Sequence, residues 1–214
     1  MAKADGAFKT PGIVNFFLIP GLVIQALCYL YLCLGSSVLG VDISAFNDPD
    51  YVPDEPAAIL YALVALLALV LLVVNFILLM LWVYRTNKNT HNLPVPDLEY
   101  EPGWAVGWWF VPFANLWKPF DMMCELYNAN RNPPDWHNLP RPALLWTWWA
   151  VSMAIILPSI AIRFVEKSGS AATSPYLALY GLGLVRIILL LVIVLRINAF
   201  QKKAYIKPGI EQVF

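Results

Sequence analysis

Long apolar blocks alternate along the chain with shorter segments that carry almost all of the charge. Four blocks run over about residues 13–34, 57–84, 143–162 and 176–199. Each has the roughly 20 residues that a helix needs to cross a ~30 Å hydrocarbon core. Because a backbone in lipid must satisfy its own hydrogen bonds, we expect all four to be helices. The pattern predicts an all-α polytopic membrane helical bundle with four transmembrane helices, built as a single membrane domain over residues 1–214.

The composition supports this class and excludes several others. Apolar residues make up 60% of the chain and charged residues 13%, whereas soluble domains are about half apolar and roughly a quarter charged. The 14 basic residues balance the 14 acidic ones, so nucleic-acid binding, which needs a basic surface, is not expected. The three cysteines form no CxxC pair, and the two histidines are isolated. We therefore expect no metal, no cofactor and no redox motif.

The basic residues predict the orientation. Eleven of them lie at the two termini and between the second and third blocks: Lys3, Lys9, Arg85, Lys88, Lys118, Arg131, Arg141, Arg196, Lys202, Lys203 and Lys207. The segment between the first two blocks contains acidic residues only, and the one between the last two holds Arg163 and Lys167. The positive-inside rule then puts both termini and the central segment in the cytoplasm. The first block is longer than the ~7–15 residues of a signal-peptide core, so it is interpreted as a retained span.

The central segment is rich in tryptophan. Eight of the nine tryptophans lie between Trp104 and Trp149. The stretch 104–120 is apolar, but it barely has the length of a span, and Gly107, Pro112 and Pro119 interrupt it. If it crossed the membrane, the basic carboxyl-terminal tail would end outside. We therefore expect an interfacial or shallow re-entrant cytoplasmic element over about residues 104–128, with the tryptophans in the headgroup layer.

Polar residues within this element recur at helical spacing. Asn115, Lys118, Asp121, Glu125 and Asn128 step by 3, 3, 4 and 3, which gives one polar stripe on a helix. One interpretation is a solvated face on a helix that lies flat on lipid. The other is that Lys118, Asp121 and Glu125 point inward and contact the bundle. Pro119 either breaks this helix or begins its second half. Candidate interface residues are Trp104, Trp108, Trp109, Trp117, Asp121 and Glu125.

Arg186 is a charged residue in the middle of the fourth block. A charge near the bilayer centre costs about 2.5 to 3.5 kcal/mol on translocon scales, and no block contains an Asp or Glu. Its possible partners are backbone carbonyls, another subunit, a bound anion such as a lipid phosphate, or one of the polar residues Asn15, Gln25, Asn75, Asp121 and Glu125. A structural arginine is the alternative to an anion or lipid site. Arg85, Asn115 and Lys118 are further candidates for lipid or anion contacts.

The order of motifs from the second block onward resembles a known family. Trp82 lies near the end of the second block, and Arg85, Asn89, Pro102-Gly103-Trp104, Pro112, Asn115 and Lys118-Pro119 follow, before a Trp-rich third block. This spacing is similar to the bacterial membrane family known as domain of unknown function 4328, over roughly residues 57–199. The resemblance implies a multi-pass protein of the bacterial cytoplasmic (inner) membrane and implies no activity.

Three functions remain open from the sequence. The first is a non-enzymatic accessory or assembly module of a membrane complex. It would bind membrane lipids, a membrane-protein partner or a second copy of itself through the tryptophan-bearing element over about residues 104–128. The second is a small anion carrier or channel that uses Arg186. The third is a lipid-headgroup enzyme that uses Asp121 or Glu125, although no nucleophile–base pair is recognisable. Asp97, Glu99 and Glu101 are interpreted as a solvated acidic loop.

Overall fold

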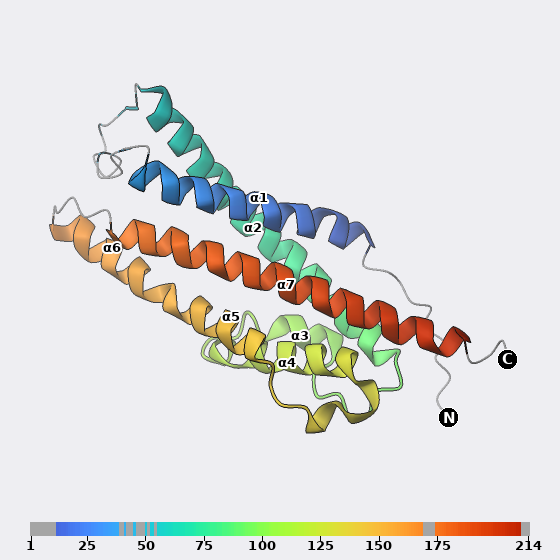
Figure 1. Cartoon of the computed structure of the whole chain (residues 1–214). Helices are drawn as coiled ribbons and strands as arrows, with labels where there is room; N and C mark the ends of the chain where they lie inside the picture. Colours follow the sequence, from blue (N-terminus) through green and yellow to red (C-terminus); the bar gives the residue numbers. More distant parts are fainter. Residues whose placement is uncertain are drawn as a thin grey trace. The chain divides into compact units, whose positions relative to one another are not determined.

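The computed structural model describes residues 12–38, 41, 45, 50, 52–53, 55–168 and 174–210 (Figure 1). Within these ranges the regular elements are helices, in the order α1 Gly12–Ser37, α2 Pro56–His91, α3 Pro102–Gly107, η2 Ala114–Leu116, α4 Lys118–Arg131, η3 Pro133–Asn138, α5 Ala143–Ala154, α6 Ile156–Ser168 and α7 Ser174–Ile210. Lys3 and Lys9, and the acidic residues Asp42, Asp48 and Asp54, lie outside the described residues. The predicted all-α class is confirmed.

Four stretches are long and apolar enough to cross a membrane: Gly12–Gly35, Pro56–His91, Ala143–Arg163 and Pro175–Tyr205. They match the four predicted spans. The second and fourth continue as helix beyond the predicted ends, since α2 runs to His91 and α7 to Ile210. These extensions carry polar residues, which pack against each other as described below. The chain is therefore a membrane protein by the length and composition of its helices.

The third span consists of two helices, α5 and α6, which are separated at Ile155. Pro158 explains the break, because it lacks an N–H and its ring clashes with the carbonyl of Ala154, four residues earlier. The N–H of Ile155 still donates to Val151 O at 3.1 Å, and that of Ser159 donates to Ile155 O at 3.4 Å. The turn between the two helices thus keeps its backbone hydrogen bonds, as a membrane segment requires.

The chain divides into two compact units. Unit 1 takes in the described residues of Met1–Ile19, Phe76–Thr147 and Leu191–Phe214, and unit 2 those of Pro20–Asn75 and Trp148–Leu190. Unit 1 contains the whole central segment between α2 and α5. Unit 2 contains Arg186 and the remaining parts of the four spans.

The central segment of unit 1 is not one continuous helix. The predicted element over about 104–128 is resolved into α3, a turn, the short η2 and then α4. Pro119 sits in the first turn of α4, where its missing N–H and fixed φ are favourable. Pro119 therefore begins a helix. The polar stripe starts at Lys118, and Asn115 belongs to the preceding η2.

A buried network of amides and hydroxyls holds α4 inside unit 1. Gln201 Nε2 on α7 donates to Thr86 O on α2 at 3.0 Å and to Asn130 Oδ1 on α4 at 3.2 Å. Asn89 Nδ2 donates to Gln201 Oε1 at 3.1 Å, and Asn130 Nδ2 donates to Thr90 Oγ1 at 2.8 Å. These bonds join three helices that are distant in sequence. They explain why α4 lies against α7 in Figure 1 with most of its residues buried.

Candidate functional site

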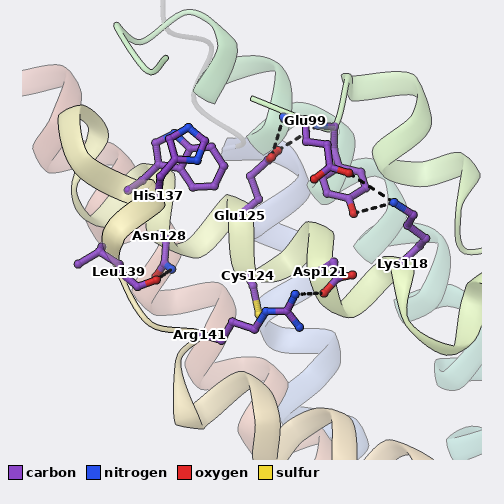
Figure 2. A pocket seen from close by; sticks show the side chains of 11 residues that line it. Glu99, Lys118, Asp121, Cys124, Glu125, Asn128, His137, Leu139 and Arg141 are labelled. Atoms are coloured by element: carbon purple, nitrogen blue, oxygen red, sulfur yellow. Dashed lines mark hydrogen bonds and ion pairs between the residues drawn. The ribbon is translucent and has the colours of Figure 1, made fainter. Parts of the chain in front are cut away.

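A polar pocket of about 240 Å³ opens on one face of α4 (Figure 2). Its walls come from α4, from the loop before α3, from η3 and from the segment between η3 and α5. The lining residues are Glu99, Tyr100, Lys118, Asp121, Cys124, Glu125, Asn128, Trp136, His137, Leu139 and Arg141. Lys118, Asp121, Glu125 and Asn128 are four residues of the predicted stripe, so the stripe does define one face of a helix, and that face lines the pocket.

Glu125 is the most buried charge-bearing group in this pocket, with 5% of its surface exposed. The backbone N–H of Glu99 donates to its Oε2 at 2.7 Å, and that of Tyr100 donates to its Oε1 at 3.2 Å. Burial raises the pKa of Glu125 to about 7, although the two N–H donors favour the ionised form. Glu125 thus fastens the loop at residues 99–100 onto α4 and titrates near neutral pH.

Lys118 lies at the aromatic side of the pocket. Its Nζ donates to the Tyr100 hydroxyl at 3.3 Å and forms an ion pair with Glu99 Oε1 at 3.4 Å. The same Nζ lies 5.1 Å from the centre of the Tyr100 ring and 5.5 Å from that of Trp108. The hydrogen bond to Tyr100 raises the pKa of Lys118 above its ordinary value. The ammonium group is therefore charged and held by cation–π contacts.

The opposite side of the pocket holds a second ion pair. Arg141 Nη2 lies 2.9 Å from Asp121 Oδ1, and the guanidinium lies 5.5 Å from the centre of the Phe120 ring. Asn128 Nδ2 donates to the carbonyls of Leu139 and Pro140, while its buried Oδ1 has no partner among the described residues. The pocket therefore offers two cations, three carboxylates and one unused amide oxygen.

Cys124 also lines this pocket, and its side chain is buried. Burial raises the pKa of its thiol to about 12, so the nucleophilic thiolate is scarce at neutral pH. Within the described part of the chain, no group of three or more His, Cys, Asp and Glu side chains is arranged to hold a metal ion. The side chains of the pocket are suited to recognising a polar or zwitterionic group by hydrogen bonds and charge.

A second feature of unit 1 is an aromatic surface on residues 102–117, which we call the Trp-rich element. Four of its aromatic side chains are half exposed or more: Trp104 at 55%, Phe110 at 64%, Phe113 at 80% and Trp117 at 50%. Phe113 also has a positive φ of 63°, which is rare for an aromatic residue. At the base of the element, the rings of Trp109 and Phe110 contact Phe76 of α2 at centroid distances of 6.2 and 5.9 Å.

The predicted site residues of unit 1 fall into three groups. Lys118, Asp121 and Glu125 line the polar pocket, and Trp104 and Trp108 line a hollow of about 370 Å³ beside Lys118. Trp109 and Trp117 belong to the Trp-rich element, and Asn115 is exposed in its η2 turn. Arg85 is exposed near the end of α2 and lines neither hollow.

Two residues of the polar stripe are buried, which bears on its two interpretations. The solvated face does not hold for Glu125 and Asn128, since both are buried. They face the loop at 99–100 and the segment at 139–140, which the sequence did not pair with α4. The acidic residues Asp97, Glu99 and Glu101 are exposed, as expected of a solvated loop.

Sequence reasoning missed the residues that complete the pocket. Tyr100 and Arg141 were not singled out for any site, yet each contacts a residue of the stripe. The sequence offers only a weak indication of their role, because each lies beside prolines in a connecting segment, and both connecting segments contact α4. Arg186 belongs to unit 2, where it lines a separate cavity.

The four helices that are long and apolar enough to cross a membrane define a membrane protein, with a folded segment between the second and third of them. The chain belongs to the family described as Domain of unknown function (DUF4328), whose model matches residues 53–202. The match includes the Trp-rich element, the polar pocket and Arg186. Searches of the curated proteins and of the solved structures found no match.

Proposed function

We propose that this protein is a non-enzymatic module of a bacterial cytoplasmic membrane that binds phospholipid through its Trp-rich element, which enters the cytoplasmic leaflet. The observation that carries the proposal is the contact of Trp109 and Phe110 with Phe76. Phe76 precedes Arg85, the first charged residue of α2, by nine residues. At ~1.5 Å per residue this separation is about 13 Å along the helix. Such a depth favours the re-entrant alternative over an element that lies flat.

The backbone of the element supports immersion in lipid. Irregular backbone is tolerated at membrane depth only where its polar groups have partners. Within the element, the N–H groups of Trp108, Trp109 and Phe110 donate to carbonyls three or four residues earlier. Those of Ala114, Asn115, Leu116 and Trp117 also donate to carbonyls of the element. Most of the turn is therefore satisfied internally.

The exposed side chains favour lipid as the occupant of this surface. Indole rings prefer the headgroup layer, where an apolar body and an N–H can both be accommodated. In water, an aromatic cluster of this kind would be an association hazard. Lys118 lies directly after the element in sequence and lines the same hollow as Trp104 and Trp108, so a headgroup beside these two rings would meet its ammonium group.

The orientation is part of the proposal. Of the basic residues outside the membrane interior, eleven belong to the termini and the central segment and two to the opposite side. This bias supports a cytoplasmic location for both termini and for the polar pocket. An accessory role in a larger membrane complex is compatible with lipid binding, and it stays a prediction. The third possibility, a headgroup enzyme, is disfavoured because Asp121 and Glu125 are already engaged and the Cys124 thiol is protonated.

Native mass spectrometry of the protein extracted in a mild detergent tests the proposal. We expect retained phospholipid on the wild-type chain and roughly tenfold weaker retention after Trp104→Ala or Trp117→Ala, since each removes an amphipathic anchor. Phe16→Ala is the matched control, because Phe16 is an exposed aromatic residue of α1 at 71%. Equal retention in all three variants would contradict the proposal. So would a stoichiometric protein partner that protects the element in place of lipid.

A further inference from the structure

Arg186 on α7 is a cation that the protein itself does not neutralise. It lies ten residues before Arg196, where the apolar part of the span ends, and none of the four spans contains an Asp or Glu. Its Nε is buried and has no hydrogen-bond partner among the described residues. A charge in this position normally pairs with another group or lines a site.

None of the polar side chains expected from the sequence bonds to the Nε of Arg186 among the described residues. Asn75 Nδ2 donates to Gln25 Oε1 at 2.8 Å, and Gln25 Nε2 donates to the Tyr29 hydroxyl at 3.3 Å. Asn15 accepts a bond from Asn198, Asp121 pairs with Arg141, and Glu125 accepts two backbone N–H groups. The Oδ1 of Asn75 is also buried without a hydrogen-bond partner among the described residues, so Asn75 does not accept from Arg186 Nε either. The polar side chains expected from the sequence therefore leave this N–H unpaired.

A cavity of about 420 Å³ in unit 2 adjoins Arg186. This volume falls in the ~300–1,000 Å³ range of pockets for small organic molecules. Most of its wall is aliphatic, from residues such as Leu32, Ala68 and Leu72, and its polar groups include Tyr29, Tyr180 and Ser159. Gly183 also lines the cavity. A Cβ on Gly183 would lie 3.0 Å from the Tyr29 ring, so the absence of a side chain lets this ring pack closely against α7.

The combination of one cation with an apolar wall specifies the chemistry of the occupant. A guanidinium matches a carboxylate in a planar, two-point hydrogen-bonded pair. An aliphatic wall favours an alkyl body, because transferring apolar surface out of water is favourable. We infer that the cavity beside Arg186 binds an organic carboxylate with an alkyl chain, the carboxylate on Arg186 and the chain along the wall of unit 2. This site is independent of the Trp-rich element.

The direct probe is [1-¹³C]decanoate, followed by NMR with the full chain in nanodiscs of zwitterionic lipid. We expect one saturable bound carboxylate signal, distinct from decanoate dissolved in the bilayer. Arg186→Gln should weaken binding about tenfold or more, since it removes the charge-assisted pair. The decanoate affinity of Arg186→Lys should lie between those of the wild type and Arg186→Gln, because an ammonium keeps the charge but lacks the planar two-point geometry of a guanidinium. Arg163→Gln is the matched control, an exposed arginine of the same unit.

A second variant tests the cavity without touching the charge. Ala68→Leu adds volume to the wall, and it should weaken decanoate binding while Arg186 stays in place. Acetate and chloride test whether the alkyl chain contributes to the affinity. Neither carries a long alkyl chain, so both should compete poorly with decanoate. Equal binding by wild type and Arg186→Gln, or by wild type and Ala68→Leu, would overturn the inference. Chloride binding at the site without decanoate binding would overturn it as well.

Discussion

The buried polar cluster around Gln201 in unit 1 differs from the surroundings of Arg186 in unit 2. In unit 1, amides and hydroxyls from α2, α4 and α7 bond to each other around Gln201. In unit 2, the amide pair Gln25–Asn75 is bonded, while the buried Nε of Arg186 has no partner in the described chain. Buried polar groups that are paired specify how helices pack. An unpaired charge beside a cavity is the setting in which we propose a ligand, so the contrast separates a structural polar cluster from a proposed binding site.

The largest expected effect is at the centre of the unit 1 network. Gln201→Leu removes one hydrogen bond from Asn89, one from Thr86 O and the donor to the buried Oδ1 of Asn130. At about 0.5–1.5 kcal/mol for each of the first two bonds and about 1–3 kcal/mol for the acceptor left unpaired, we expect a loss of roughly 3–5 kcal/mol in unfolding free energy. Unfolding in mixed micelles measures it. Lys202→Ala, at the exposed neighbouring position, should change little, and equal stability of the two variants would show that the network is not structural.

Glu125 gives unit 1 a predicted pH dependence of its unfolding free energy. Its folded pKa of about 7 lies above the value of 4.5 for an unperturbed Glu. A raised carboxyl pKa stabilises the fold below about pH 4.5, and this stability is lost as the pH rises through 7. The expected loss between pH 4.5 and pH 8 is about 3 kcal/mol, at ~1.4 kcal/mol per pKa unit.

Unfolding of Glu125→Gln over the same pH range provides the test. Gln carries no titrating proton, so the pH-dependent loss should disappear. Glu101→Gln is the control, since Glu101 is exposed in the same loop. A wild-type protein that is equally stable at pH 5 and pH 8 would contradict the assignment of Glu125.

The smallest of these effects concerns the bonded amide pair of unit 2. A Cβ added to Gly21 would lie 2.2 Å from Asn75 Oδ1, so Gly21→Ala must push the amide away from Gln25. We expect a loss of about 2 kcal/mol, because a buried hydrogen bond is broken and two amides are left without it. Gly181→Ala is the matched control, as nothing lies within 4 Å of its added Cβ. Helix propensity alone should stabilise that control by up to ~1 kcal/mol.

Much of this fold is readable from the sequence, because membrane spans depend on local composition. The four spans follow from apolar length. A helix that begins at Pro119 was one of two alternatives, and the structure has Pro119 in the first turn of α4. The polar stripe from Lys118 to Asn128 also follows from helical spacing. What faces the stripe does not, because the loop at 99–100 reaches Glu125 through a contact 26 residues away in sequence.

The hydrogen bonds around Gln201 show the same limit on what the sequence predicts. Thr86, Asn89 and Thr90 recur on one face at the end of α2, and Asn198 and Gln201 do so on α7, so polar faces were visible in the sequence. Their mutual contact depends on the relative register of two helices more than 100 residues apart, which periodicity does not fix. The depth of the Trp-rich element likewise depends on the contact between Trp109 and Phe76.

The central claim is that the Trp-rich element enters the membrane, and a spin label at Phe110→Cys tests it most directly. The label is read by power-saturation EPR in liposomes, on a chain with Cys28, Cys33 and Cys124 replaced by Ala and with a second label at Asp97→Cys as the aqueous reference. We predict that the label at position 110 is relaxed mainly by oxygen, at a depth below the headgroups, and that the label at 97 is relaxed mainly by a water-soluble nickel chelate. Dominant relaxation of both labels by the nickel chelate would contradict the account.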